Sequence, residues 1–279
     1  MDKKVLVVNQ PFIKDFCRCQ RWPARTRSRV MRPPDWLAYA AAVLKQSGCD
    51  VELYDCIANA WDTARFTELI RRKRPAFVVL DSSTPSIFSD IECARICKKE
   101  ASAIVIMVGT HASALPEETL RLSQGAVDVI AIGEYDLTVR DIVHSSAALD
   151  DIKGIAFLDR EKFVKTAVRP LIEDLDSLPF PAWEFLDIKK YFDAGRLYPF
   201  IEIIGGRGCP YRCTFCQWPE LMFGHIYRFR SPGNIVDEIE HDLALFPALK
   251  YGEFFFEDDT FTVNKERAFQ ICEEIQRRG

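Results

Sequence analysis

Three cysteines are the residues in this sequence whose type and spacing most directly indicate chemistry. Cys209, Cys213 and Cys216 are separated by three and then by two residues. Three thiolates can hold three irons of a cubane iron–sulfur cluster, and the fourth iron then lacks a protein ligand. An open metal position is where a second molecule can bind and be activated. The spacing therefore predicts a catalytic metal centre.

Two other interpretations of the cysteines remain open at this point. A structural zinc site needs a fourth protein ligand, because structural zinc is four-coordinate and closed. The downstream candidates are His225, His241 and Cys272, none of which forms a second short-spaced pair. Disulfides are the other alternative, but ten cysteines without a signal peptide or a repeated framework fit a reducing compartment better. The cluster interpretation is favoured over both.

An apolar run and several glycines precede the cysteines. Residues Tyr198 to Ile204 are largely apolar and predict a buried strand. Gly205, Gly206 and Gly208 follow, and glycine allows a chain to bend sharply around a bulky group. We therefore expect a loop at the end of a strand, bent around the metal centre.

The stretch from Gly205 to Cys216 resembles the signature of the radical S-adenosylmethionine superfamily. The resemblance implies a [4Fe-4S] cluster on the three cysteines, whose free iron binds the amino and carboxylate groups of S-adenosylmethionine. One-electron reduction then cleaves the sulfonium and releases a 5′-deoxyadenosyl radical. The resemblance also implies that Phe215, just before the last cysteine, packs on the adenine.

Residues 4 to 145 alternate short apolar runs with helical patterns, which predicts an α/β domain with a doubly wound, Rossmann-type parallel sheet. Helices are expected from Pro34 and Asp35 up to Gly48, and from Pro116 up to Gly125. The predicted strands are Val5 to Val8, Val51 to Tyr54, Phe77 to Leu80, Ile104 to Val108 and Val127 to Ile132. In such a sheet the ligand crevice lies at the carboxyl ends of the strands.

Small and hydroxylic residues gather in the loops just after these strands, where a backbone can approach a flat macrocycle or a phosphate. Together with the cysteines, this pattern resembles the cobalamin-binding domain that precedes many radical S-adenosylmethionine enzymes. The resemblance implies cobalamin contacts from Asn9, Ser82, Ser83, Thr84, Gly109, Thr110, His111, Gly133 and Glu134. The alternative is a retained domain without the cofactor.

One departure from the wider cobalamin-binding pattern concerns the cobalt ligand. Mutase-type domains carry Asp-x-His-x-x-Gly after the first strand, whereas the segment from Asn9 to Ile13 has no histidine. The departure argues against histidine ligation of cobalt more than against cobalamin itself. His111 follows the fourth predicted strand, where the family commonly has a histidine. A loop histidine whose ring is satisfied by the backbone is an equal alternative.

An arginine-rich loop lies between the first predicted strand and its helix. It also contains Cys17, Cys19 and Trp22, and its arginines are Arg18, Arg21, Arg25, Arg27, Arg29 and Arg32. Such a loop could clamp a phosphate or a carboxylate, or it could form a solvated lid. Contact with nucleic acid ranks third, because few aromatic residues are interleaved. Cys17 and Cys19 are expected to be free thiols.

The remaining chain is predicted to form a connector and part of a second domain. Residues 146 to 199 contain a hairpin pattern and a proline-rich segment that resembles the interdomain linker of the family. Residues 200 to 279 resemble the first part of the partial (β/α) barrel of the superfamily, with a helix from Ser231 and Pro232 and a strand from Glu253 to Phe256.

An acidic run follows that strand. Glu257, Asp258 and Asp259 match the family segment that meets the methionine amino group of S-adenosylmethionine, and carboxylates suit an ammonium. The alternative is an acidic turn that caps the next helix. Only about two strand–helix units fit after residue 200, whereas a barrel takes on the order of 200 residues. We therefore expect a truncated barrel with an exposed edge near Phe254 to Phe256, inactive or poorly stable by itself.

Composition bounds the remaining possibilities. The 279-residue chain carries 37 basic and 41 acidic residues, and its formal net charge of -4 gives no global attraction to nucleic acid or anionic membranes. No run of about eighteen apolar residues occurs, and a cytoplasmic location is expected.

The resemblance implies an enzyme that cleaves S-adenosylmethionine and, most commonly, transfers a methyl group through cobalamin to an unactivated carbon. Radical cyclisation or rearrangement without methylation is the nearest alternative. A non-catalytic cobalamin-binding or zinc-binding protein is the alternative from another class. The implied partners are a small-molecule or natural-product substrate and an electron donor, either a reductase or a flavodoxin or ferredoxin. Nucleic acid is not expected.

Overall fold

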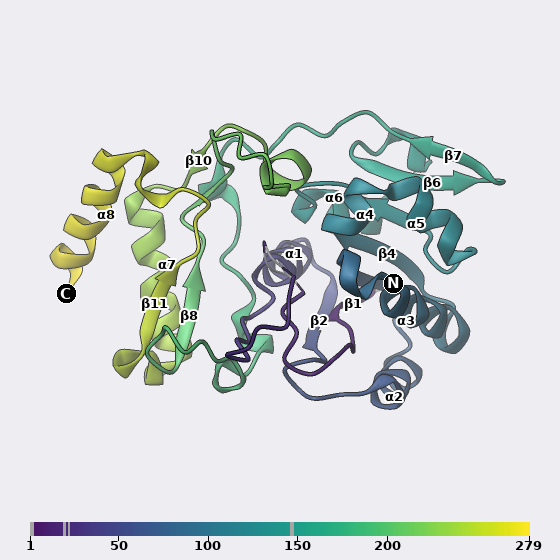
Figure 1. The fold of residues 1–279 in the computed structure, drawn as a ribbon, viewed down its shortest axis with the longest axis horizontal. Helices are drawn as coiled ribbons and strands as arrows, with labels where there is room; N and C mark the ends of the chain where they lie inside the picture. The colour runs from purple at the N-terminus through teal and green to yellow at the C-terminus, as the bar shows by residue number, and fades with distance from the viewer. Residues whose placement is uncertain (1–2, 19–20, 22, 146–147) are drawn as a thin grey trace.

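Seven strands form the largest sheet of the protein, in the order β2-β1-β3-β4-β5-β6-β7 (Figure 1). This computed structural model describes residues 3–18, 21, 23–145 and 148–279. The strands are β1 (Lys4–Asn9), β2 (Asp50–Asp55), β3 (Phe77–Ser82), β4 (Ile104–Gly109), β5 (Val129–Ala131), β6 (Ile155–Asp159) and β7 (Lys162–Lys165). Strands β1 to β5 run parallel, which confirms the predicted parallel sheet.

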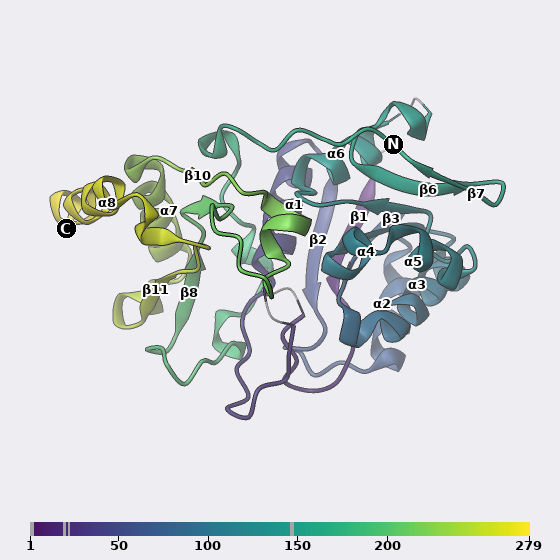
Figure 2. The same cartoon turned by 45° about the horizontal axis from the view of Figure 1, so that its top comes forward.

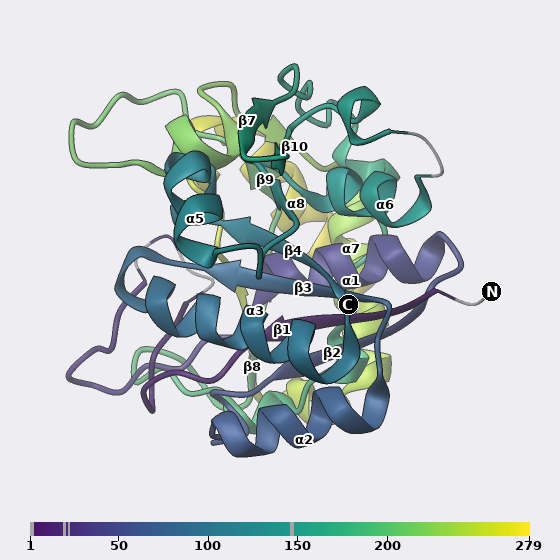
Figure 3. The same ribbon diagram turned by 90° about the vertical axis from the view of Figure 1, so that its right-hand side faces the viewer.

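Helices cover both faces of the sheet, as the doubly wound arrangement requires (Figure 3). They are α1 (Asp35–Gln46), α2 (Thr63–Lys73), α3 (Ile87–Ala101), α4 (Thr110–Ala114), α5 (Pro116–Ser123) and α6 (Asp136–His144). Residues 5 to 8 of strand β1 are all apolar because both faces of the strand are buried. Val5 and Val7 pack with α1 and α6 on one face, whereas Leu6 and Val8 pack with α2 and α3 on the other.

The predicted hairpin forms, but it belongs to the sheet and not to a separate connector. Strand β6 pairs antiparallel with β5, and β7 pairs antiparallel with β6. The expected boundary at residue 145 therefore falls inside the sheet, which continues to Lys165 and is mixed. The physical reason is that β5 would otherwise present an unpaired edge, whose backbone groups β6 satisfies.

A second, smaller unit contains two strand–helix pairs. Strands β8 (Phe200–Ile203) and β11 (Glu253–Phe256) are parallel, and α7 (Pro232–Leu245) and α8 (Lys265–Arg278) pack on one face of them. The side chain of Ser231 caps α7, as its position in the sequence predicted, and Asn264 caps α8. Among the described residues, β11 pairs only with β8, so its other edge has no strand beside it.

The two units share one apolar core, centred on α1 (Figures 1 and 2). The ring of Trp36 on α1 lies 4.4 Å from that of Phe223 and 5.9 Å from that of Trp218, measured between ring centroids. Both partners follow the cysteines in the sequence. The continuous core therefore brings the cysteine-bearing segment against the first domain.

Two statements complete the description of the fold. No helix within the described ranges is long and apolar enough to cross a membrane. Cys19 and Trp22 of the arginine-rich loop lie outside the described residues, so the predictions made for them stay predictions.

Gly109, at the end of β4, offers a test of this architecture. Its φ is +95°, and an added Cβ would lie 2.0 Å from Asp81 Oδ1. We expect Gly109→Ala to lower the free energy of unfolding by about 3 kcal/mol, because left-handed strain and overpacking add.

Gly48 provides the matched control, because its φ is +86° but an added Cβ would meet nothing within 4 Å. Gly48→Ala should cost only about 1 kcal/mol of backbone strain. Urea denaturation followed by circular dichroism measures both. Equal losses for the two variants would contradict the close approach between β3 and β4.

Candidate functional site

A narrow cleft lies at the carboxyl ends of β3 and β4, the edge where a sheet of this strand order binds its ligand. We call it the strand-end cleft; it has a volume of about 10 Å³ and is lined by Arg18, Trp36, Asp81, Ser82, Gly109, Thr110, Tyr135, Trp218 and Met222. The cleft brings together Ser82, Gly109 and Thr110 from the predicted cobalamin contacts. Trp218 and Met222, which follow the last cysteine, close it from the opposite side.

Three other predicted contact residues use their polar atoms within the protein. Asn9 Nδ2 donates to Asp55 Oδ1 over 3.0 Å. The Oγ atoms of Ser83 and Ser86 are 2.7 Å apart. Thr84 Oγ1 lies 3.1 Å from His111 Nδ1. A cofactor contact through these atoms would therefore require the internal hydrogen bonds to rearrange.

The His111 ring is buried beside the cleft. Burial lowers the pKa of His111, so the ring is neutral near pH 7. Its Nδ1 is paired with the hydroxyl of Thr84. The alternative in which the backbone satisfies the ring does not hold for this nitrogen. Within the described part of the chain, Nε2 is buried without a hydrogen-bond partner. A buried polar atom in this state costs free energy that a bound ligand group could recover.

Arg18 is a site residue that the sequence did not distinguish from the other arginines of its loop. Its buried guanidinium lies 3.1 Å from Asp90 Oδ1 and 3.2 Å from Ser86 Oγ, and it forms one wall of the strand-end cleft. Arg25 and Arg29 are exposed. The arginine-rich loop is thus buried at Arg18 and exposed from residue 25 to residue 29.

A larger cavity of about 510 Å³ adjoins the strand-end cleft, with Met222 in the walls of both. We call it the interdomain cavity. Gly133 and Glu134, after β5, line one side, and residues 219–222 line the other. Gly133 has a φ of +72°, and an added Cβ would lie 3.3 Å from Leu221 O. Glycine is therefore required where the two backbones meet.

The carboxylate of Glu134, a predicted cobalamin contact, is hydrogen-bonded within the protein. It accepts hydrogen bonds from Arg207 over 2.9 Å, from Arg228 over 2.9 Å and from the Ile172 backbone over 2.8 Å. Its side chain is 3% exposed. A cofactor contact through this carboxylate would have to displace protein partners.

The cysteines lie in a long loop between two short strands, β9 (Gly206–Arg207) and β10 (Arg228–Phe229), which pair antiparallel. We call residues 208–227 the cysteine loop. Cys216 N donates to Cys213 O over 3.0 Å, so these two cysteines share one turn. Cys209 N donates to Gly224 O over 3.2 Å. Within the described residues, no three cysteine, histidine or acidic side chains are gathered as a metal site, and the metal-ligand assignment stays a prediction.

His225, the zinc-ligand alternative nearest in sequence, braces the cysteine loop. Its Nε2 lies 2.8 Å from Glu220 Oε1, and its Nδ1 lies 3.2 Å from Cys209 O and 3.1 Å from Tyr211 O. Both ring nitrogens therefore face oxygen acceptors. The other two candidates are on helices, His241 on α7 and Cys272 on α8.

Asp258 supports the glycine run that leads into the cysteine loop. Its carboxylate accepts hydrogen bonds from Gly205 N over 2.5 Å and from Tyr227 Oη over 2.6 Å, and the side chain is fully buried. An added Cβ at Gly206 would lie 2.6 Å from the Tyr227 ring. Asp258 thus fixes the residues that lead into the cysteine loop. Its predicted contact with S-adenosylmethionine would require these hydrogen bonds to break.

The other two acids of the run face the arginine-rich loop. Glu257 lies 2.9 Å from Arg32 Nη1, and Asp259 lies 2.6 Å from Arg21 Nη2. Asp259 also accepts a hydrogen bond from Gly208 N over 3.1 Å, next to the first cysteine. These carboxylates are therefore already paired with cations at the end of β11.

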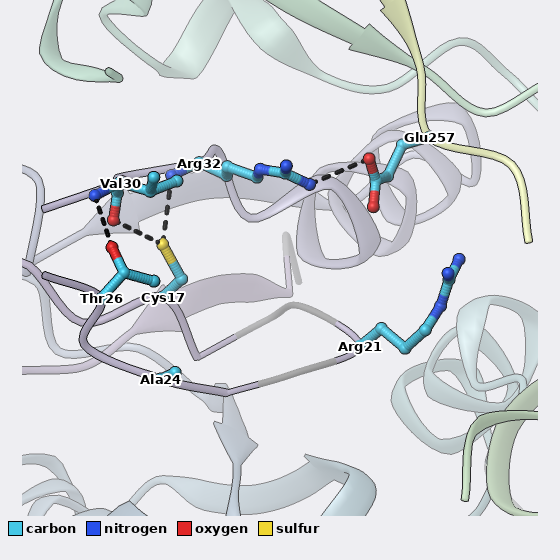
Figure 4. Close-up of a pocket in the computed structure, with 7 residues that line it drawn as sticks. All are labelled: Cys17, Arg21, Ala24, Thr26, Val30, Arg32 and Glu257. Carbon is cyan, nitrogen blue, oxygen red and sulfur yellow. Dashed lines mark hydrogen bonds and ion pairs between the residues drawn. The ribbon is translucent and has the colours of Figure 1, made fainter. Parts of the chain in front are cut away.

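Figure 4 shows a cavity of about 200 Å³ beside this contact, lined by Cys17, Arg21, Ala24, Thr26, Val30, Arg32 and Glu257. Burial raises the pKa of the Cys17 thiol to about 11. Its sulfur donates to Val30 O over 3.1 Å and accepts from Arg32 N over 3.3 Å. Cys17 is a free, protonated thiol, as predicted.

Comparisons with known proteins place this geometry in context. The family model described as the B12 binding domain matches residues 27–143. An uncharacterized methyltransferase of Pyrococcus horikoshii is 31% identical over 88% of this chain and 53% of its own length. The anaerobic magnesium-protoporphyrin IX monomethyl ester cyclase of Cereibacter sphaeroides is 31% identical over 88% of this chain and 40% of its own length. The chain thus spans about half the length of these curated relatives.

The fold is similar to that of a solved enzyme. The radical S-adenosylmethionine methyltransferase TsrM from Kitasatospora setae, determined with cobalamin and a [4Fe-4S] cluster bound, superimposes with a TM-score of 0.72. The superposition covers 100% of this chain and 51% of that chain, at 18% identity. This likeness confirms the predicted fold class, a cobalamin-domain-like sheet followed by the first barrel elements.

The contribution of Asp258 to the stability of the protein should depend on pH. Burial raises the pKa of Asp258 to about 6, although Tyr227, Arg267 and the backbone of Gly205 lower it. The folded protein therefore binds this proton more tightly than the unfolded chain does. The contribution of Asp258 to stability increases as pH falls from about 6 to about 4, by up to about 3 kcal/mol.

We expect Asp258→Asn to remove this pH dependence while keeping a side chain of the same shape. Urea denaturation of both proteins between pH 4 and pH 7 measures the effect. The stability of the parent protein should rise relative to that of Asp258→Asn as pH is lowered. Parallel pH profiles would show that burial does not raise the pKa of Asp258 in the folded protein.

Proposed function

We propose that the chain belongs to the cobalamin-binding group of radical S-adenosylmethionine proteins and is part of an enzyme that cleaves S-adenosylmethionine reductively. One observation carries the proposal. The segment that follows Cys216 closes the sheet edge where small residues follow β3 and β4. This contact supports the inference that the cysteines with cluster spacing and the cobalamin-type ligand edge serve one site.

The cysteine loop has the donor set for the cluster. Cys209, Cys213 and Cys216 would be its ligands, and their thiols are partly or fully exposed to an incoming metal. His225 is held by Glu220 and by loop carbonyls, which favours three protein ligands over four. When bound, the cluster would supply one electron to S-adenosylmethionine. The chain itself holds the loop open toward solvent and braces both of its ends.

Residues around the loop would bind S-adenosylmethionine. Phe215 has 73% of its surface exposed and can stack on the adenine. Glu257 and Asp259 would receive the methionine amino group in exchange for part of their pairing with Arg32 and Arg21. Asp258 belongs to the same run and would act mainly by supporting Gly205.

The strand-end cleft and the interdomain cavity together would hold cobalamin. Gly109 lines the cleft and Gly133 lines the cavity, and the orphaned His111 Nε2 offers a buried polar atom. Ser82 and Thr110 supply hydroxyls at the same edge. At about 10 Å³ the cleft is too small for a macrocycle while Trp218 and Met222 cover it, so binding requires residues 217–224 to shift.

The reaction we favour is methyl transfer to an unactivated carbon, with cobalamin as the methyl carrier. One relative is named as a methyltransferase, which supports this choice. Another is named as a cyclase, so radical ring formation without methylation is the second candidate. The substrate would be a small molecule or natural product. A reductase, flavodoxin or ferredoxin would donate the electron, and the free cysteines suit the reducing cytoplasm.

The three cysteine ligands can be tested one at a time. We expect Cys209→Ala, Cys213→Ala or Cys216→Ala to reduce iron and sulfide from about four per chain to near zero after anaerobic reconstitution. Cys272→Ala, which changes an exposed cysteine on α8, is the matched control and should keep its iron. Metal analysis and visible absorption measure the outcome. One zinc and no sulfide in the parent chain would support the non-catalytic alternative.

The cobalamin site can be tested by filling the strand-end cleft. We expect the parent chain to retain added hydroxocobalamin through desalting, as read from its visible absorption. Thr110→Phe should lose at least about tenfold in affinity, because the new ring occupies the cleft. Thr63→Phe, at an exposed position on α2, should bind like the parent. Equal retention by both variants would place the cofactor elsewhere, and retention by none would indicate an empty domain.

A further inference from the structure

Glu134 holds both ends of the cysteine loop at once, although it belongs to the other domain. The loop leaves from Arg207 on β9 and returns at Arg228 on β10. Arg207 Nη1 donates to Glu134 Oε1 over 2.9 Å, and Arg228 Nη1 donates to Glu134 Oε2 over 2.9 Å. A single carboxylate therefore joins the first and last residues that flank the loop.

Asp136 completes a closed set of charges. It accepts hydrogen bonds from Arg207 over 2.7 Å and 3.3 Å. We call Glu134, Asp136, Arg207 and Arg228 the buried ion cluster; the exposed fractions of these side chains lie between 2% and 9%. The two arginines of the cluster face its two carboxylates, so these four buried charges compensate one another.

Aromatic rings surround the Arg207 guanidinium on its open sides. Its central carbon lies 5.2 Å from the Trp36 ring, 4.8 Å from the Tyr39 ring and 5.3 Å from the Phe223 ring. Burial opposes the positive charge, but Asp136 and Glu134 outweigh burial and raise the pKa of Arg207 above its usual range. The guanidinium is thus a fixed cation with a fixed orientation.

We propose that Glu134 is a positioning residue for the iron–sulfur cluster: from the first domain, it clamps both ends of the cysteine loop and sets the charge around it. This inference rests on the proposed function for the cluster itself. The clamp itself can be tested separately from that function, because its hydrogen bonds join only protein side chains.

The clamp also connects the loop to the ligand edge of the sheet. Residues 133–136 follow β5, and they contact the two cavities as well as the cysteine loop. Gly133 lines the interdomain cavity, Tyr135 lines the strand-end cleft, and Glu134 holds the cysteine loop. A ligand at either place would therefore contact the segment that positions the cysteines.

Glu134→Gln tests the clamp, because the amide keeps the shape but loses the charge. Hydrogen–deuterium exchange of the cofactor-free full chain reports on the loop directly. We expect exchange in residues 206–209 and 226–229 to become about tenfold faster, while that of α3 is unchanged. After anaerobic reconstitution, the midpoint potential of the cluster should become more positive, because the variant removes the negative charge that compensates Arg207 and Arg228 at the ends of the loop.

Glu238→Gln is the matched control. Glu238 is fully buried and pairs with Arg230, and within the described residues its carboxylate has no hydrogen bond to β9 or β10. This variant removes an equally buried charge and should leave the loop exchange and the cluster potential at parent values. A loss of stability alone would affect both variants alike, so the potential separates positioning from a general structural role.

Arg228→Gln provides a second route if Glu134→Gln does not fold. It should accelerate exchange at residues 226–229 and spare residues 206–209, which Arg207 still holds. Unchanged loop exchange in the folded variants would overturn the clamp. Faster exchange with an unchanged cluster potential would overturn the positioning role. If the parent chain bound no cluster, the proposed function would fail, and the exchange data would still decide whether the clamp exists.

Discussion

Two arginines and two carboxylates, buried where the two domains meet, constrain how the rest of the molecule fits together. A buried charge is tolerated only if a partner and hydrogen bonds compensate it. Arg207 and Arg228 come from the ends of the cysteine loop, whereas Glu134 and Asp136 come from the sheet. These charges therefore favour the docking in which the cysteine loop lies against the ligand edge.

The cysteine loop is held from two directions and left open in the middle. Glu134 fixes its ends to the first domain, and Asp258, after β11, fixes Gly205 to the second. Between these anchors the cysteines are partly or fully exposed. For the proposed cluster, anchored loop ends would limit the rearrangement that brings the three cysteines together around the metal.

Local patterns predicted the secondary structure well, because each strand carries its signal within a few residues. The buried run of β1 and the cap of α7 at Ser231 are examples. The hairpin of β6 and β7 was also predicted, but not its pairing with β5. That pairing depends on an edge left open by strands far away in the sequence, and no local pattern records it.

The sequence by itself determined the spacing of Cys209, Cys213 and Cys216, the glycines around them and the small residues after β3 and β4, because these properties are local. Only the tertiary structure decided which charges face each other. Glu134 lies 73 residues before Arg207 and 94 before Arg228, so its role as their common partner arises only when the chain folds. The same reason applies to Asp258, whose hydrogen bonds with Gly205 and Tyr227 no local pattern records.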